Sequence, residues 1–299
     1  MTPEQTGELA AIGTALLWTL SALAWTSAGR HVGAVAVSFL RLVIAIVLLM
    51  AYGQIVRGLP LPTGAAAERW LILGLSGVMG FLVCDLCLFK AFLLIGPRLS
   101  LLIFSLAPPL AALLGRVFLA DVLLPRHWLG MAVTLAGIVW VVLEQPQTEP
   151  HPHQRRQLQQ GIFLAAVAAA AGAAGYVLSK RGIGDYDAVA ATLIRIFGAV
   201  AGYVLCLTIF RRWRPVLAAA GHGRAMVIIS LGAVVGPCVG VALSMEALRQ
   251  CPAGVVATIL ATMPVLILPC TILLYGERVS LRAAAGAVIS VAGIALLML

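Results

Sequence analysis

The sequence predicts an all-α, polytopic membrane protein with ten transmembrane helices arranged as two inverted five-helix repeats. Three observations support this prediction: the composition is extremely apolar, long apolar runs recur along the chain, and the two halves resemble each other. The chain is 62% hydrophobic and only 10% charged, with a mean hydropathy of +1.06. Soluble globular chains are about 45–50% apolar and about 25% charged. This chain therefore has too little polar surface to cover a water-facing shell, and its composition requires lipid as the solvent.

Ten apolar runs are separated by charged residues or by clusters of Pro and Gly. At about 20 residues per membrane-spanning helix, the 299 residues have room for ten helices and for loops of ordinary length. The expected spans are 9–28, 34–56, 70–90, 98–118, 127–143, 161–179, 188–210, 226–245, 253–275 and 282–299.

The most polar interruption divides the chain near its middle. It follows Glu144 and contains two histidines and a basic pair but almost no apolar residue. We therefore expect a first five-helix repeat at 1–144, a polar linker at 145–160 and a second five-helix repeat at 161–299.

The two halves align with each other at a nearly constant offset. Phe39 to Val43 lines up with Leu193 to Phe197 at an offset of 154 residues, and Pro109 lines up with Pro264 at 155. An offset this steady indicates an internal duplication. Because each half crosses the membrane an odd number of times, the second half is inverted relative to the first, as in many secondary transporters.

Three charged residues lie inside the expected spans. Arg41 and Arg195 each lie about eight residues into an apolar span, where an arginine costs about 2.5–3.5 kcal/mol on insertion scales unless it snorkels or is paired. Either both are structural, packed against carbonyls or headgroups, or they border an aqueous cavity and attract a carboxylate or phosphate. Asp85 in the third span either forms an ion pair with Lys90 or serves as a proton-coupling or amine-binding carboxylate.

Prolines interrupt equivalent spans of the two halves. Pro109 and Pro264 fall in the fourth and ninth spans, and Pro237 falls in the eighth. Proline frees a carbonyl and kinks a helix, which a bilayer tolerates mainly where protein or a water-filled cavity satisfies the backbone. Paired broken helices in the two repeats indicate a central binding site, and kinks that serve only packing are the alternative. We take these three prolines as candidate kink or gating positions.

Small, hydroxyl-bearing and aromatic side chains gather near these kinks and in the first span of each half. Such a set is suited to enclosing a small amphipathic solute. The candidate cavity residues are Trp18, Ser21, Phe104, Ser105, Tyr176, Thr258 and Thr262.

Two further features of these spans are interpreted as structural. Trp25, near the end of the first span, is typical of the aromatic belt at a membrane interface. Gly232, Gly236 and Gly240 form a small-xxx-small stripe that allows close helix packing.

The cysteines give no sign of a disulfide framework or a metal site. All six sit inside or at the ends of apolar runs, and the C-x-x-C of Cys84 and Cys87 has no second pair and no histidine nearby. We expect them to fill space in the core.

The sequence contains no His-x-x-x-His, no Gly-x-Ser-x-Gly and no nucleotide-binding loop of the G-x-x-x-x-G-K-S/T type. We therefore expect no enzyme activity, no catalytic residue, no metal, no cofactor and no direct use of ATP. The net charge of +9 is attributed to loops that face anionic headgroups, and not to nucleic acid.

Several of these elements together resemble the EamA-type members of the drug/metabolite transporter superfamily. The resemblance covers nearly the whole chain. The residues that carry it are Trp18, Arg41 and Arg195, the acidic residues Asp121 and Glu277 after the Pro-centred spans, and the Gly-rich fifth spans at 130–142 and 286–297.

The resemblance implies two inverted five-helix repeats around a central cavity with alternating access. It predicts a secondary membrane transporter that exports aromatic or neutral amino acids or similar small metabolites. The expected partners are a small-molecule substrate and membrane lipids, and a monomer is compatible with the sequence. The alternative is a flippase or exporter of hydrophobic drugs or lipids, because an apolar cavity would suit either solute.

The expected location is the bacterial inner (cytoplasmic) membrane, and the orientation in it is open. Residues 1–9 carry no Lys or Arg, so they lack the basic region of a cleaved signal peptide, and we expect the first helix to be retained. The resemblance implies that both termini are cytoplasmic. That orientation places eleven loop Lys and Arg residues outside and seven inside, which the positive-inside rule mildly opposes.

Overall fold

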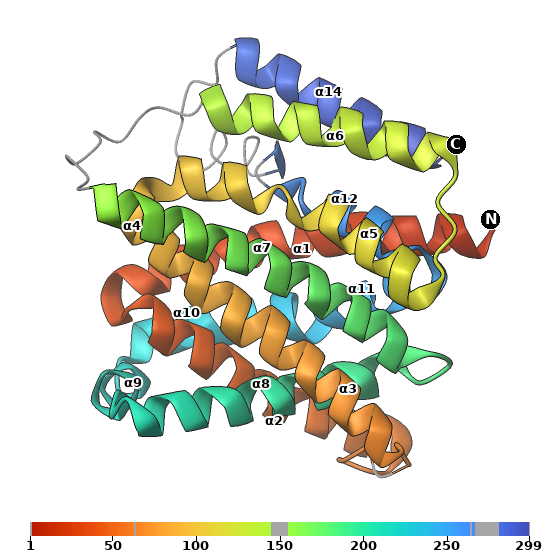
Figure 1. Cartoon of the computed structure of the whole chain (residues 1–299). Coiled ribbons are helices and arrows are strands. Elements are labelled where there is room, and N and C mark those ends of the chain that lie inside the picture. Colours follow the sequence, from red (N-terminus) through yellow and green to blue (C-terminus); the bar gives the residue numbers. More distant parts are fainter. Residues whose placement is uncertain (1, 63, 145–154, 264, 267–280, 299) are drawn as a thin grey trace.

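The computed structural model describes residues 2–62, 64–144, 155–263, 265–266 and 281–298, and every regular element within these ranges is a helix (Figure 1). The first half contains α1 (Pro3–Val32), α2 (Ala34–Arg57), α3 (Ala67–Gly77), the π-helix η1 (Val78–Val83), α4 (Cys84–Phe104), α5 (Ala107–Leu119) and α6 (Pro125–Glu144). The second half contains α7 (Arg155–Ile183), α8 (Ala188–Ile209), α9 (Trp213–Ala220), α10 (Gly223–Ala233), the π-helix η2 (Val234–Gly240), α11 (Val241–Gln250), α12 (Ala253–Leu260) and α14 (Leu281–Met298).

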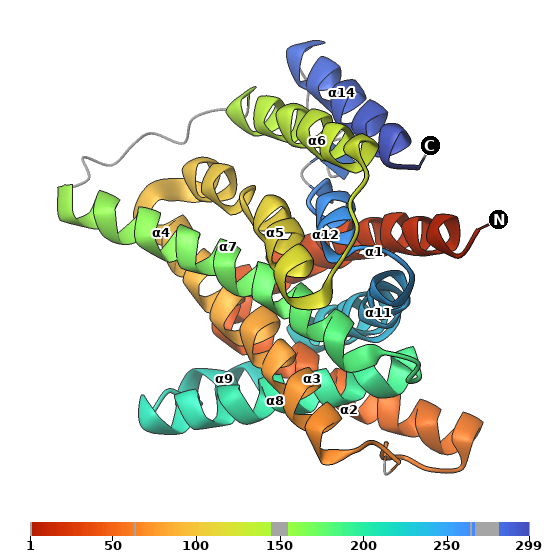
Figure 2. The same cartoon turned by 45° about the vertical axis from the view of Figure 1, so that its right-hand side comes forward.

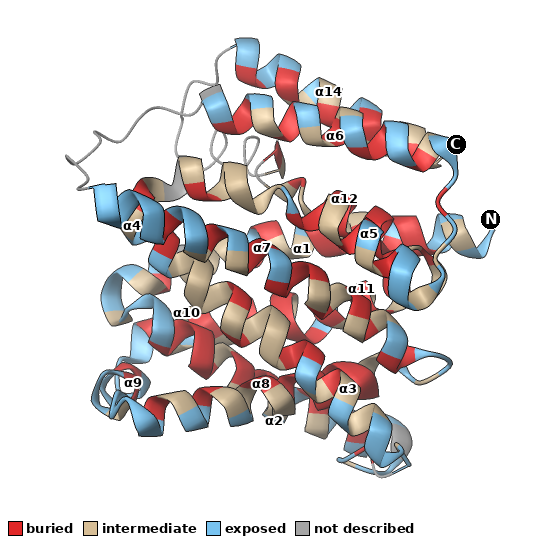
Figure 3. Ribbon diagram, in the orientation of Figure 1, coloured by how far each residue is buried: buried red, intermediate tan, exposed pale blue. Residues whose placement is uncertain are grey.

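Nine segments within the described residues are long and apolar enough to cross a membrane. The tenth expected span, 253–275, begins with α12 and extends past the described residues. Large apolar side chains are exposed on the outer faces of the helices, with Leu93 at 86% and Leu281 at 90% (Figure 3). In water such exposure would be costly, and in a bilayer it is the expected state. The prediction of an all-α polytopic membrane protein is confirmed.

The helices run side by side, and the two halves are inverted relative to each other. α1 starts on the side of the molecule where both termini lie and crosses to the far side, whereas its counterpart α7 crosses in the opposite direction (Figure 1). Equivalent helices of the two halves also meet: α6 packs against α14, α5 against α12, and α2 against α8 (Figure 2). The inverted repeat expected from the sequence is therefore present in the fold.

Both fourth spans are interrupted at matching positions. In the first half, Gly96 with φ 77° separates the third span from the fourth inside α4, and a turn at Ser105 and Leu106 separates α4 from α5. In the second half, α12 ends at Leu260 and a turn follows at 261–262. Prolines are tolerated in the first turn of a helix, and Pro108 and Pro109 lie in the first turn of α5, immediately after the break.

The third span of each half contains a π-helical segment. η1 and η2 begin at Val78 and Val234, 156 residues apart, which is close to the offset of the internal repeat. Pro237 lies inside η2, where it cannot donate a backbone hydrogen bond. Single π-helical turns occur often at functional sites, and the apolar pattern of these spans does not predict them.

The contact between α3 and α8 depends on glycine. A Cβ atom on Gly198 would overlap the backbone of Gly74, and a Cβ on Gly77 would overlap the backbone of Arg195. Two helices approach this closely only where one of them presents no side chain. This contact holds the cavity-lining part of α8 directly against α3.

Replacing Gly198 with alanine should therefore destabilise the protein, by about 1–3 kcal/mol as expected for overpacking. The same change at Gly29 in α1, whose Cβ would meet nothing within 4 Å, is the matched control and should be neutral. Thermal unfolding of the purified variants in detergent measures the difference. Equal melting temperatures for the two variants would contradict the close packing of α3 and α8.

Candidate functional site

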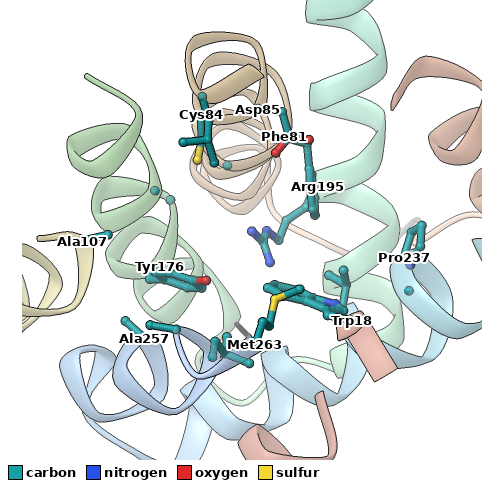
Figure 4. Close-up of a pocket in the computed structure, with 18 of the residues that line it drawn as sticks. Trp18, Phe81, Cys84, Asp85, Ala107, Tyr176, Arg195, Pro237, Ala257 and Met263 are labelled. Carbon is teal, nitrogen blue, oxygen red and sulfur yellow. The ribbon is translucent and has the colours of Figure 1, made fainter. Parts of the chain in front are cut away.

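A cavity of about 260 Å³ lies between the two halves of the molecule (Figure 4). Its walls come from α1, α2, η1, α4 and α5 of the first half and from α7, α8, η2, α11 and α12 of the second. The aromatic lining residues are Trp18, Trp25, Phe81, Phe104 and Tyr176, and the charged ones are Arg41, Asp85 and Arg195. The remaining wall is mainly aliphatic side chains and glycine backbone, so the charged groups face an otherwise apolar space.

Two of the charged residues form an ion pair. Nη2 of Arg41 on α2 lies 2.5 Å from Oδ2 of Asp85 on α4, and the two side chains are 11% and 22% exposed. The Arg41 guanidinium also stacks on Trp25, 4.2 Å from the ring centroid. The two opposite charges of the pair therefore cancel at this wall of the cavity.

This geometry corrects two expectations. Asp85 pairs with Arg41, 44 residues away in the chain, and not with Lys90, which is exposed on the same helix. Trp25 is not a belt residue at the membrane surface: it lines the cavity and packs against Gly232 and Gly236. In both cases the environment of the residue is determined by contacts between helices, and not by its neighbours in the sequence.

The third charged residue, Arg195 on α8, is 5% exposed. Its Nε donates to Ser76 Oγ at 3.0 Å, its Nη1 donates to Met245 Sδ at 3.1 Å, and its guanidinium lies 5.1 Å from the Phe81 ring centroid. Figure 4 shows the guanidinium pointing into the pocket, toward Trp18. Among the residues that the structure describes, Arg195 has no carboxylate partner.

The structure brings seven of the residues singled out from the sequence to this cavity. They are Trp18, Arg41, Asp85, Phe104, Tyr176, Arg195 and Pro237. They come from six different helical elements, so only the tertiary structure brings them together.

The four hydroxyl residues expected at the cavity do not line it. Each hydroxyl instead donates to a backbone carbonyl three or four residues earlier in the chain at 2.7 Å, which uses its single O–H donor. These bonds run from Ser21 to Leu17, from Ser105 to Leu102, from Thr258 to Gly254 and from Thr262 to Ile259. Pro109 lies in α5 away from the cavity lining, and Pro264 lies outside the described residues.

Several cavity features were missed from the sequence. Gly80 and Phe81 in η1 and Gly236 in η2 line the cavity because the two π-helical segments meet it from opposite halves. The glycine stripe was the available signal, since Gly232, Gly236 and Gly240 pack against the tryptophans of α1.

A second polar cluster lies on the side of the molecule that carries the termini. Oδ1 of Asp121 lies 2.7 Å from Nζ of Lys180, and its Oδ2 accepts a hydrogen bond from the Ala253 backbone N–H at 3.0 Å. Lys180 Nζ also donates to the Cys251 carbonyl at 2.7 Å. Asp121 is 7% exposed. The cluster ties the loop after α5, the end of α7 and the loop before α12 together, and we call it the terminal-side latch.

Within the described ranges, no three His, Cys, Asp or Glu side chains come together as potential metal ligands. The polar and aromatic groups that the described lining residues offer are two arginines, the Asp85 carboxylate and five aromatic rings.

Comparisons with known proteins support a specific family. A model of the EamA-like transporter family matches residues 5–143 and again residues 159–299. One solved crystal structure has a TM-score of 0.77 and 22% sequence identity, covering 97% of this chain and 95% of that one. At this identity the likeness concerns the fold alone. A comparison with curated proteins gave no match.

The Arg41 and Asp85 pair should behave as a coupled unit. Asp85→Asn or Arg41→Met alone leaves one buried charge without its partner and should cost about 3–5 kcal/mol of stability. The double variant Arg41→Met/Asp85→Asn removes both charges and should lose less than the sum of the two single variants. Thermal unfolding of the four proteins in detergent measures this coupling, and strictly additive losses would show that the pair is not coupled.

Proposed function

The chain belongs to the EamA-like transporter family, so it is a multi-pass membrane transporter of small molecules, and we propose that it exports aromatic or neutral amino acids, or similar small metabolites. The proposed mechanism is alternating access through the central cavity, and the proposed location is the bacterial inner membrane.

One observation carries the substrate proposal: the cavity combines aromatic walls with a small number of buried charges. A cavity of about 260 Å³ is slightly smaller than the pockets of about 300–1,000 Å³ that bind drug-sized ligands, so it suits a small solute. Trp18, Phe104 and Tyr176 offer flat apolar surfaces, while Arg195 and the Arg41–Asp85 pair offer groups for a zwitterion.

Three features support alternating access. The two halves are inverted repeats that meet at the cavity, which is the architecture in which one half rocks against the other. The π-helical segments η1 and η2 and the breaks near Ser105 and Ala261 place irregular backbone around the cavity. The terminal-side latch fastens one end of the helices, which one state of such a cycle requires.

A second candidate function is export of hydrophobic drugs or lipids. The observation that favours it is the apolar character of most of the wall, including Leu42, Leu88, Val241, Leu260 and Met263. The small volume of the cavity and its three charged residues favour the amino-acid proposal.

Transport by the purified protein tests the proposal. Proteoliposomes loaded with a mixed pool of amino acids, nucleobases and sugar phosphates should lose amino acids selectively and saturably, as measured by mass spectrometry against protein-free liposomes at several pH gradients. Ala261→Phe places a ring in the cavity wall and should reduce this loss to near the protein-free rate. Ala51→Phe, on the exposed face of α2, is the matched control and should transport normally.

Loss of a fluorescent hydrophobic dye or a labelled lipid, with retention of every amino acid, would contradict the amino-acid proposal and favour the second candidate. Equal transport by the Ala261→Phe and Ala51→Phe proteins would contradict the central cavity as the route.

The terminal-side latch should control access from its own side of the membrane. Cys251 is buried beside it, so a protein that retains only this cysteine reports whether the latch is closed. Asp121→Asn or Lys180→Met should speed the labelling of Cys251 by a membrane-impermeant maleimide at least several-fold, because each change breaks a largely buried ion pair.

The control for the latch experiment is Glu246→Gln, which breaks the more exposed pair of Glu246 and Arg249 on the same side. Surface pairs contribute little to stability, so this variant should label at the parent rate. Unchanged labelling in both latch variants would show that Asp121 and Lys180 do not hold that side closed.

A further inference from the structure

Each half of the molecule has an arginine at the equivalent position, but the two arginines have different partners. Arg41 and Arg195 align in the internal repeat at an offset of 154 residues, and both line the cavity. Arg41 has a carboxylate partner in Asp85 at 2.5 Å. Arg195 is more buried, and it donates hydrogen bonds to the neutral atoms Ser76 Oγ and Met245 Sδ.

The second half lacks the acid that would complete the symmetry. The residue that corresponds to Asp85 at an offset of 155 is Gly240. A Cβ on Gly240 would lie 2.8 Å from Cδ1 of Trp18, so the tryptophan occupies the space that a carboxylate side chain would need. Among the described residues that line it, the cavity therefore has two arginines and one carboxylate, with a formal charge of +1.

The geometry of Arg195 leaves part of its guanidinium open for a ligand. Nε is occupied by Ser76, and Nη1 uses one of its two N–H groups on a thioether, which is a weak acceptor. Nη2 faces Gly80, and a Cβ atom added to this glycine would still lie 3.5 Å from Nη2. The edge formed by Nη1 and Nη2 is the edge that binds a carboxylate with two parallel hydrogen bonds.

We infer that Arg195 binds the carboxylate of the transported molecule, and that the substrates are monocarboxylates with an apolar or aromatic side group. This inference rests on the proposed transport function and adds to it the group that the substrate must carry. One unpaired arginine balances a single negative charge, which favours a carboxylate over a doubly charged phosphate monoester. The rings of Phe81, Trp18 and Tyr176 lie around Arg195 and provide the surface for the apolar group (Figure 4).

The test is binding to the purified full chain in detergent, measured by calorimetry. The probes are phenylalanine, 3-phenylpropionate, phenethylamine and phenyl phosphate, which share the ring and differ in their charged groups. The wild-type protein should bind the two carboxylates and bind phenethylamine at least about tenfold more weakly. Equal or tighter binding of phenethylamine or phenyl phosphate by the wild-type protein would overturn the inference without any variant.

Variants then test whether Arg195 is responsible for the binding of the carboxylates. Arg195→Met should weaken binding of both carboxylates roughly 10- to 100-fold, as expected for the loss of hydrogen bonds to a charged group, and should not weaken phenethylamine. Arg195→Lys keeps the positive charge but loses the planar guanidinium. Its affinity for the two carboxylates should therefore lie between the affinities of the wild type and of Arg195→Met. Arg249→Met, at an exposed arginine far along α11, is the matched control and should bind as the wild type does.

The same proteins separate this inference from the transport proposal. If wild-type proteoliposomes release no substrate while carboxylates bind through Arg195, transport fails and the site stands. If the wild type transports phenylalanine and the Arg195→Lys and Arg195→Met proteins bind and transport it unchanged, the inference fails and transport stands.

Discussion

The bilayer core contains no water, and this constraint shapes every part of the molecule. Each backbone N–H and C=O must find a partner within the protein, so the chain crosses as helices. Departures from regular helix are tolerated only where protein or a cavity meets the freed groups. In this chain the π-helical segments η1 and η2 reach the cavity, as do the residues beside the breaks near Ser105 and Ala261. The irregular backbone and the candidate binding site are consequences of the same constraint.

Glycine is the second means by which the fold is held together. Where helices of the two halves cross, as at Gly74 and Gly198 or at Gly137 and Gly286, a Cβ on Gly198 or on Gly137 would overlap the backbone of the other helix. Lipid supplies no hydrophobic driving force for helix association, so stability comes from close van der Waals packing. The aromatic side chains of α1 fit against the glycine stripe of α10 and η2 by the same principle, and this packing sets the positions of Trp18 and Trp25 beside the cavity.

The sequence was sufficient to predict the fold and the charged residues of the site, because both leave a direct signal. Apolar runs mark the spans, and a nearly constant offset marks the repeat. A charged residue inside an apolar run can be identified without knowing which way its side chain points. The partner of Asp85 was not predictable, since Lys90 was the nearest cation in sequence whereas Arg41 is reached only through helix packing. The prediction that four hydroxyl residues line the cavity was wrong, because a Ser or Thr side chain can donate its hydroxyl to the backbone carbonyl one turn earlier. The π-helical segments left no signal beyond glycine and proline, which also occur in ordinary membrane helices.

The inverted repeat gives the cavity two nearly equivalent walls, and a symmetric cavity would have no means of orienting an asymmetric solute. The charges remove that symmetry. Arg41 is neutralised by Asp85, whereas the position equivalent to Asp85 is Gly240, filled by Trp18. Because a buried charge is costly when unpaired, selection for stability alone would favour an acid near Arg195 or the loss of the arginine. A cation kept in the cavity without a carboxylate among the described residues is explained if the missing negative charge arrives with the substrate, so that binding supplies the ion pair that the second half of the molecule lacks.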